Sequence, residues 1–371
     1  MVKKKTVGII TMHRVVNCGS ALQAYALQRI IQDMGFDAEL IDYIYPNRYH
    51  KSLHKVTGLK GYARKLYSYM LQSRNKRNFR GFYKKFFVLS EICYRSKEDL
   101  ILSSPHYDIY VSGSDQVWNP KSIAYDTSFM LSWVKEGKRI AYSGSFATTT
   151  IPEEYRDTYS SALSKYDSLS VREERSLSIL NDLSGKSAEF VLDPALLLDS
   201  HRWEDVINDA SVVIPEEYIL VYILGYSFNA YPYALELINY LEEKYKKQIV
   251  VLAMSRTYVP QLHNKKVIRE ISPQNFLSLI SKAALVVTDS FHATAMSINF
   301  QVPFYSLVLD KLSKDNRVYS LLQSLGAEDR AVEKGCEFNE LPPFIMNFSK
   351  VTEKLILQRG KSMDYLKRSL L

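Results

Sequence analysis

Short apolar runs alternate with amphipathic stretches along most of the chain. Thr6 to Thr11 is an apolar run, and Ala21 to Met34 then carries apolar residues at i, i+3 and i+4 spacing. A second apolar run, Ala38 to Tyr43, follows Gly35. This pattern predicts a strand, a helix and a second strand, because period 3.6 is helical and short β-branched runs favour buried strands. Such a unit implies a parallel sheet with a right-handed crossover.

Four further apolar runs in the first half each end in small or polar residues. They cover residues 107–112, 138–143, 168–171 and 190–192, and they lead into GSDQVWNP, GSFA, REERS and DPALLL. The carboxyl ends of parallel strands meet at one edge of a sheet, where α/β proteins bind their ligands. We therefore expect a ligand-facing edge on a doubly wound sheet.

The same alternation resumes after a polar stretch at about residues 200–217. Strands are predicted at 218–225, 248–254, 284–288 and 304–309, with helices at 230–247, 274–283, 293–300 and 315–325. We predict an α/β protein with parallel sheets in two Rossmann-like domains facing a cleft. The domains cover residues 1–205 and 206–345, and residues 346–371 form a basic helical tail that can cross back to the first domain.

One histidine lies where a strand passes into a helix. Ala284 to Thr288 reads as a buried strand, Asp289 and Ser290 are residue types that begin helices, and His292 follows them. A histidine at the amino end of a helix could donate to an oxyanion or move a proton near neutral pH. It could equally fill the turn, since every α/β protein has several such corners.

The net charge of +8 is concentrated in one segment. No Asp or Glu occurs between Tyr43 and Ser90, where twelve Lys or Arg lie, at positions 48, 51, 55, 60, 64, 65, 74, 76, 77, 80, 84 and 85. We interpret residues 44–90 as a basic helical insertion in the first domain. The segment 48–85 is either a solvated surface or a face for anionic lipid or a lipid-linked polyphosphate. It contains no known nucleic-acid motif, so we expect no nucleic-acid partner.

Absent patterns exclude several classes of protein. The three cysteines, Cys18, Cys93 and Cys336, are isolated and suggest neither a disulfide framework nor a zinc site. No apolar run reaches the length of a membrane span, and the basic start is too short for a signal sequence, so we expect a cytoplasmic protein, at most peripheral to the inner face of a membrane. Phosphate-loop, GxGxxG, GxSxG and HExxH motifs are all missing.

Six motifs follow one another at strand ends: NCGSALQAYAL (17–27), SGSDQVWNP (112–120), AYSGSFA (141–147), SVREER (170–175), LDPAL (192–196) and TDSFHATAMS (288–297). In this order and spacing they resemble the polysaccharide pyruvyl transferase family, from Thr6 to about Arg330. The resemblance implies a fold similar to GT-B glycosyltransferases. It also implies transfer of pyruvate from phosphoenolpyruvate to a sugar of a cell-surface polysaccharide or its lipid-linked precursor, forming a ketal, without a metal or organic cofactor.

The resemblance also implies roles in binding the donor. Arg172 falls where the family has its donor-binding arginine, and its planar guanidinium suits a carboxylate or phosphate. The alternative for Arg172 is a salt bridge to Glu173 or Glu174. His292 matches the family histidine, which could hold the phosphate or protonate the methylene carbon as a general acid.

The chain departs from the family at one donor position. Several members carry an arginine two residues before the histidine, where this chain has Ser290. We therefore include Ser290 in the donor site and expect Arg317 or Arg14 to replace the missing cation.

Small and polar residues at the other strand ends are candidates for acceptor binding. Asp115 could be the base or accept a sugar hydroxyl, or it could cap the following helix. Trp118 could stack on a sugar ring or lie in the core. Asp193 with Pro194 is interpreted as a structural turn. The remaining acceptor-binding candidates are Asn17, Gly19, Ser20, Ser114, Ser143 and Ser145.

Two other functions stay open at this point. A GT-B-type glycosyltransferase that uses a nucleotide sugar would have the same fold. A non-catalytic glycan-binding relative is the second alternative, and Ser290 in place of the arginine is its motivation.

Overall fold

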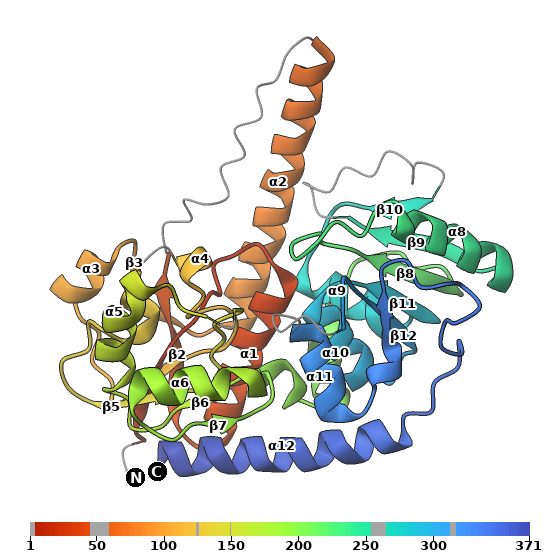
Figure 1. The fold of residues 1–371 in the computed structure, drawn as a ribbon. Coiled ribbons are helices and arrows are strands. Elements are labelled where there is room, and N and C mark those ends of the chain that lie inside the picture. The colour runs from red at the N-terminus through yellow and green to blue at the C-terminus, as the bar shows by residue number, and fades with distance from the viewer. Residues whose placement is uncertain (1–3, 45–58, 124–125, 149, 254–264, 312–316) are drawn as a thin grey trace. The chain divides into compact units, whose positions relative to one another are not determined.

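Two parallel sheets, one in each half of the chain, organise the fold (Figure 1). The computed structural model describes residues 4–44, 59–123, 126–148, 150–253, 265–311 and 317–371, and within them the side chains of 59–69 and of Ser122 are not described. The chain divides into a first unit (1–52, 84–198 and 356–371) and a second unit (53–83 and 199–355). Both units have α/β architecture with parallel strands, which confirms the predicted fold class.

The first unit contains a five-stranded sheet in the order β3-β2-β1-β4-β5. Its strands are β1 (Thr6–Ile10), β2 (Asp37–Tyr43), β3 (Leu89–Tyr94), β4 (Ile109–Ser112) and β5 (Lys138–Ala141). The short strands β6 (Ser170–Val171) and β7 (Glu189–Phe190) continue it through bridges beside β5. β1 lies at the centre because its apolar side chains are buried on both faces, as parallel sheets require.

Helices connect the strands of the first unit. They are α1 (Cys18–Asp33), α3 (Lys97–Leu102), α4 (Pro120–Ile123), α5 (Glu153–Leu163) and α6 (Leu177–Ser184). α1 begins three residues earlier than predicted, because the Asn17 side chain accepts a hydrogen bond from the Ser20 amide and caps the helix. Asn17 is therefore the capping residue of α1.

The second unit contains a six-stranded sheet in the order β10-β9-β8-β11-β12-β13, the order of a dinucleotide-binding Rossmann sheet. Its strands are β8 (Tyr218–Tyr222), β9 (Gln248–Leu252), β10 (Lys266–Ile268), β11 (Leu285–Thr288), β12 (Phe304–Val308) and β13 (Ala331–Glu333). The helices are α7 (Glu204–Ile207), α8 (Tyr233–Tyr245), α9 (Pro273–Ser281), α10 (Phe291–Asn299) and α11 (Arg317–Leu325). The carboxyl edge of this sheet holds the predicted histidine.

Two long helices complete the described fold. α2 (Leu59–Phe86) is one continuous helix inside the basic segment, and residues up to Tyr83 belong to the second unit rather than to the first. α12 (Ser349–Leu370) packs on the first unit from Ile356 onward, where Tyr365 donates to the Ala141 carbonyl at 2.8 Å. Among the helices described, none is both long and apolar enough to cross a membrane. Residues 45–58, which hold three of the twelve basic positions, lie outside the described residues.

Candidate functional site

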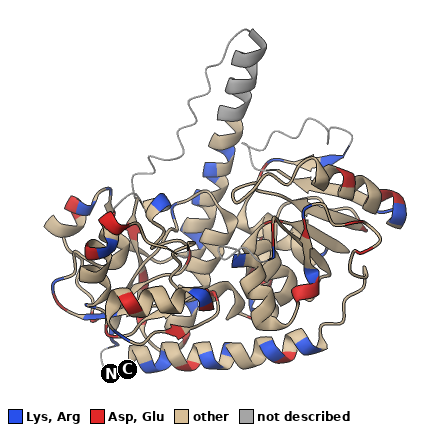
Figure 2. Cartoon of the chain, in the orientation of Figure 1, with Lys and Arg blue, Asp and Glu red and all other residues tan. Residues whose placement is uncertain are grey.

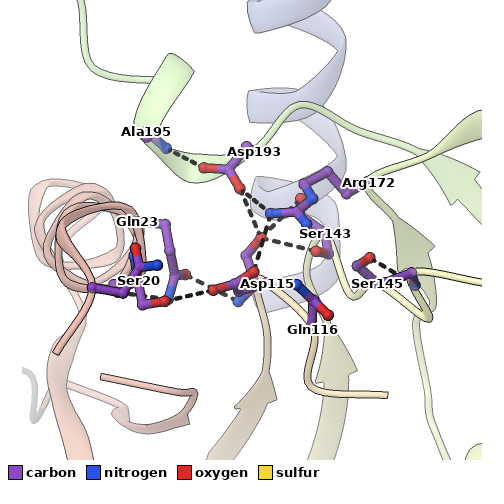
Figure 3. Close-up of polar contacts among 12 residues, drawn as sticks. Ser20, Gln23, Asp115, Gln116, Ser143, Ser145, Arg172, Asp193 and Ala195 are labelled. Atoms are coloured by element: carbon purple, nitrogen blue, oxygen red, sulfur yellow. Dashed lines mark hydrogen bonds and ion pairs between the residues drawn. The ribbon is translucent and has the colours of Figure 1, made fainter. Parts of the chain in front are cut away.

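Loops at the carboxyl ends of β1, β4, β5, β6 and β7 meet in one polar cluster in the first unit (Figure 3). Ser20, in the first turn of α1, donates to Asp115 Oδ2 at 2.7 Å. Ser114 Oγ donates to the Ser143 carbonyl at 2.9 Å and lies 3.2 Å from Asp193 Oδ2. Side chains that follow five predicted strands therefore share one network, as expected when parallel strands end at one edge.

Arg172 is the centre of this cluster. Its Nη1 lies 3.0 Å from Asp193 Oδ2 and 3.5 Å from Asp115 Oδ1, and its Nε donates to Glu173 Oε1 at 3.1 Å. The side chain is only 1% exposed. Burial acts to lower the pKa of the guanidinium, but the carboxylates of Glu173, Asp115 and Asp193 outweigh it and raise that pKa above its usual value. Arg172 thus stays charged in a buried site.

These contacts change the interpretation of Arg172. One guanidinium already faces three carboxylates of the protein, so its charge is balanced without a bound anion. A phosphate or carboxylate of a donor would have to replace these partners in a buried, low-dielectric site. The salt bridge to Glu173, the alternative to donor binding, is present in the structure.

Asp115 reaches across the cluster from a strained part of the β4–α4 loop. Its φ of 72° lies in the left-handed region, which aspartate tolerates better than most residues. Its two carboxylate oxygens lie against Ser20 and Arg172, on different elements. The carboxylate is therefore held in one orientation by groups on both sides.

The serines at the strand ends form hydrogen bonds within the loops. Ser114, Ser143 and Ser145 are fully buried, and Ser145 Oγ donates to Glu173 Oε1 at 2.9 Å. Their hydroxyls form internal hydrogen bonds, so they shape the strand ends rather than present hydroxyl groups to a sugar. Of the predicted acceptor residues on the first loop, Asn17 is half-buried and Gly19 is buried.

Trp118 lies in the hydrophobic core, which is one of the two alternatives left open by the sequence, and it is too buried to stack on a sugar. It is 0% exposed, and its ring packs 5.2 Å from Phe146 and 6.3 Å from Tyr166, measured between ring centroids. Gly144 provides the room, since a Cβ there would lie 2.6 Å from the indole ring. The indole is a packing element behind the cluster.

Three further polar side chains belong to the cluster, and none of them was among the predicted site residues. Gln23 donates to Thr11 Oγ1 at 2.9 Å and accepts from the Ser114 amide at 3.2 Å. Glu173 binds both Arg172 and Ser145, as described above. Asp193 caps a turn by accepting from the Ala195 amide at 3.0 Å, and it also pairs with Arg172. Its position at the end of a strand was the only available signal.

In the second unit, the predicted histidine lies in the first turn of α10. Ser290 is the capping residue, since its side chain accepts from the Ala293 amide at 3.4 Å, and His292 is the second helical residue. The histidine is buried, and its ring lies edge-on to Phe291 with the ring centroids 5.2 Å apart. Backbone N–H groups and the helix dipole favour an anion at this end of the helix.

Asp289 ties two loops of this edge together. Its carboxylate accepts from the Leu224 amide and the Gly225 amide, both at 2.7 Å. Burial raises the pKa of Asp289, and these amide donors reduce the shift without cancelling it. Tyr226, which follows the fixed loop, is 66% exposed. The second unit therefore carries an exposed aromatic ring next to the loop that precedes His292, and Tyr226 was not among the predicted site residues.

The two candidate replacement cations lie in different settings. Arg317 is the first residue of α11 and follows β12, the neighbour of β11, so it belongs to the same sheet edge as His292. Arg14, in the first unit, donates to both carboxylate oxygens of Asp42. The buried His13 ring also lies 3.3 Å from Asp42 Oδ1. Arg14 is thus held by a carboxylate of the first unit, whereas Arg317 is the candidate that lies at the sheet edge of His292.

No group of three or more His, Cys, Asp or Glu side chains among the described residues could hold a metal ion.

Comparisons with known proteins bear on the whole chain. Residues 17–311 match the family model for polysaccharide pyruvyl transferase. No curated protein matches the chain. Among solved structures, Arabidopsis thaliana UGT89C1 with UDP-L-rhamnose is 11% identical, covers 100% of both chains and has a TM-score of 0.50. Staphylococcus aureus MnaA with UDP is 11% identical, covers 94% of both chains and also has a TM-score of 0.50. At this identity the structures show the shared GT-B-like fold alone.

Proposed function

The chain belongs to the polysaccharide pyruvyl transferase family, and from this membership we propose that it transfers pyruvate from phosphoenolpyruvate to a sugar. The acceptor is a cell-surface polysaccharide or its lipid-linked precursor, and the product is a cyclic ketal. The proposal is carried by His292, which occupies the family motif in the first turn of α10, at an edge suited to an anion. A protein acting on a lipid-linked acceptor would work in the cytoplasm at the inner face of a membrane.

The reaction makes specific demands on protons. One sugar hydroxyl adds to C2 of phosphoenolpyruvate while its C3 methylene gains a proton and becomes a methyl group. The second hydroxyl then displaces phosphate from C2, which closes the ketal and releases inorganic phosphate. The site must protonate a carbon, accept the hydroxyl protons and stabilise the leaving phosphate.

We assign the donor to the second unit. Phosphoenolpyruvate is an anion with a phosphate and a carboxylate, and the amino end of α10 offers N–H groups for one of them. Arg317, at the same sheet edge, supplies a cation, and Ser290 contributes as the capping residue. His292 either holds the phosphate or protonates the methylene carbon.

We assign the base to the first unit. Asp115 is the candidate because its carboxylate is fixed between Ser20 and Arg172 at a sheet edge. Arg172 acts through Asp115 rather than on the donor. No metal or organic cofactor enters this scheme, so we expect turnover to persist after treatment with a chelator.

Phosphate release from phosphoenolpyruvate, measured with a panel of glycan and lipid-linked acceptors, tests the proposal. The His292→Ala variant should lose about 10²–10⁴-fold in kcat, the usual contribution of a general acid. The matched control is His201→Ala, which removes an imidazole that is 84% exposed and paired only with Glu204 in the contacts of the described residues. Full turnover by His292→Ala would refute the assigned role.

A second candidate is a glycosyltransferase that uses a nucleotide sugar. It is favoured by Ser290 in place of the family arginine, and the two similar structures hold UDP or UDP-L-rhamnose. Thermal shift separates the two donors, because a ligand at 100 times its Kd stabilises the protein by about 2.7 kcal/mol. Stabilisation by phosphoenolpyruvate supports pyruvyl transfer, and stabilisation by UDP- or GDP-sugars supports glycosyl transfer. Glycan binding without turnover for any donor would support a non-catalytic relative.

A further inference from the structure

One face of α2 is fixed to the second unit. The Asn75 side chain donates to the Arg269 carbonyl at 3.3 Å and accepts from the Ile271 amide at 3.0 Å. Leu71 and Phe79, one turn before and after Asn75, are buried on the same side. Paired amide hydrogen bonds and buried apolar side chains hold the helix in one rotation about its axis.

The opposite side of the helix is cationic. Lys76, Arg77 and Arg80 are exposed, and at about 100° per residue they fall within an arc of about 100°. We call these three residues the cationic face. The blue bands along α2 in Figure 2 show the Lys and Arg of its described part. The buried side, centred on Asn75, lies about 150° away around the helix.

The charged groups of the cationic face form no ion pairs within the described part of the protein. No ion pair is formed there by Lys76, Arg77 or Arg80. Arg74, by contrast, lies outside the arc and pairs with Glu270. No acidic residue occurs between Tyr43 and Ser90, so α2 itself offers no partner. A surface with unpaired charges of a single sign suits an anionic partner.

An exposed apolar side chain extends the cationic face. Met70 is 50% exposed and lies about 20° beyond the arc, about 9 Å before Lys76 along the helix axis. Helices that bind a membrane surface typically combine cations, which reach the lipid phosphate groups, with an apolar side chain, which enters the boundary of the acyl chains. Binding of single-stranded nucleic acid relies instead on exposed aromatic rings, and the rings of Phe79 and Phe82 are buried on the other sides of the helix.

We propose that the cationic face of α2, with Met70, docks the protein on an anionic bilayer surface. Docking needs neither phosphoenolpyruvate nor an acceptor, so it stands independently of the proposed reaction. Each Lys or Arg near an anionic surface contributes about 1 kcal/mol, or about fivefold in partitioning. The three cations together therefore account for about 100-fold.

Vesicle co-sedimentation of the full chain tests the docking. The probes are phosphatidylcholine vesicles with and without 30% (about one lipid in three) phosphatidylglycerol, compared at low and high salt. The Lys76→Gln, Arg77→Gln, Arg80→Gln triple variant should lose about 100-fold in binding to the anionic vesicles. The matched control is Lys246→Gln, Lys282→Gln, Lys350→Gln, which removes the same charge from exposed positions of the second unit. It should bind within about threefold of wild type, since distant charges are screened.

Three results would overturn the proposal. Equal losses in the two triple variants would mean that net charge alone drives binding. Undiminished binding of the cationic-face variant would mean that α2 is not the docking surface. Absence of vesicle binding with tight binding of a single-stranded oligonucleotide would identify a nucleic-acid partner instead. The single substitution Met70→Ser should weaken vesicle binding relative to wild type and leave the salt dependence of that binding unchanged. All the substitutions are at exposed positions, and circular dichroism checks that each variant folds.

Discussion

Replacing Arg172 by methionine is the sharpest test of how the first unit holds its polar cluster. Methionine keeps most of the side-chain volume and removes the charge. Three buried carboxylates, Asp115, Glu173 and Asp193, then face one another without a cation. Removing one partner of a buried ion pair costs about 3–5 kcal/mol. The first unit has 183 residues, so this loss lowers its Tm by about 6–20 °C, at about 2–4 °C per kcal/mol.

Differential scanning calorimetry measures this loss, and a second substitution identifies its cause. Asp193→Asn removes one of the carboxylates, so the double variant Arg172→Met, Asp193→Asn should be more stable than Arg172→Met alone. If Arg172→Met keeps the wild-type Tm and only raises the KM for phosphoenolpyruvate, Arg172 is a donor ligand and the positioning role is wrong.

Three further changes test other parts of the account. We propose that the exposed Tyr226 ring stacks on a sugar of the acceptor, so Tyr226→Ala should raise the KM for the acceptor about tenfold with little change in kcat. Tyr226→Phe keeps the ring and should stay near wild type, and equal effects of the two substitutions would exclude stacking. Asp42→Asn should destabilise the protein by about 2 kcal/mol at pH 7, since charged hydrogen bonds from Arg14 and His13 are lost. Burial alone would raise the pKa of Asp42, but these partners hold that pKa below its usual 3.8. The ionised carboxylate therefore stabilises the folded protein above that pH, and the stability difference between Asp42→Asn and wild type in urea titrations should shrink as the pH falls below about 4. Gly144→Ala should cost about 1–3 kcal/mol in the same titrations, because its Cβ would overlap the indole ring behind it; wild-type stability would contradict the packing described here.

Hydrophobic periodicity predicted the strands of both sheets that are buried on both faces, and their order along the chain. It missed the edge strands β3, β10 and β13. In β3 (Leu89–Tyr94), Glu91, Ile92 and Cys93 are exposed, so the apolar run that marks a buried strand is absent. Apolar runs in a sequence indicate which strands are buried. An edge strand is defined by its backbone hydrogen bonds to one neighbour, and these do not require an apolar run.

The sequence predicted where the residues of the candidate site lie in the fold, but it did not predict which of these residues form ion pairs with one another. Polar residues at strand ends pointed to Asp115 and Arg172, and helix-starting residues pointed to His292. The pairing of Arg172 with Asp193 joins residues 21 apart in sequence through the sheet edge, which no local pattern reports. Trp118 was equally ambiguous, because an aromatic residue at a strand end can face solvent or the core. Its burial follows from the space at Gly144, which is a tertiary property.

The proposed reaction is tested most directly by NMR of phosphoenolpyruvate labelled with ¹³C at C3, incubated in D₂O with the protein and lipid-linked glycan acceptors. The account predicts one inorganic phosphate released for each ketal formed, and a product methyl group that carries a single deuterium, because one proton is delivered to the methylene carbon from solvent. The His292→Ala variant should abolish this signal. Unchanged phosphoenolpyruvate, together with consumption of a nucleotide sugar under the same conditions, would contradict pyruvyl transfer.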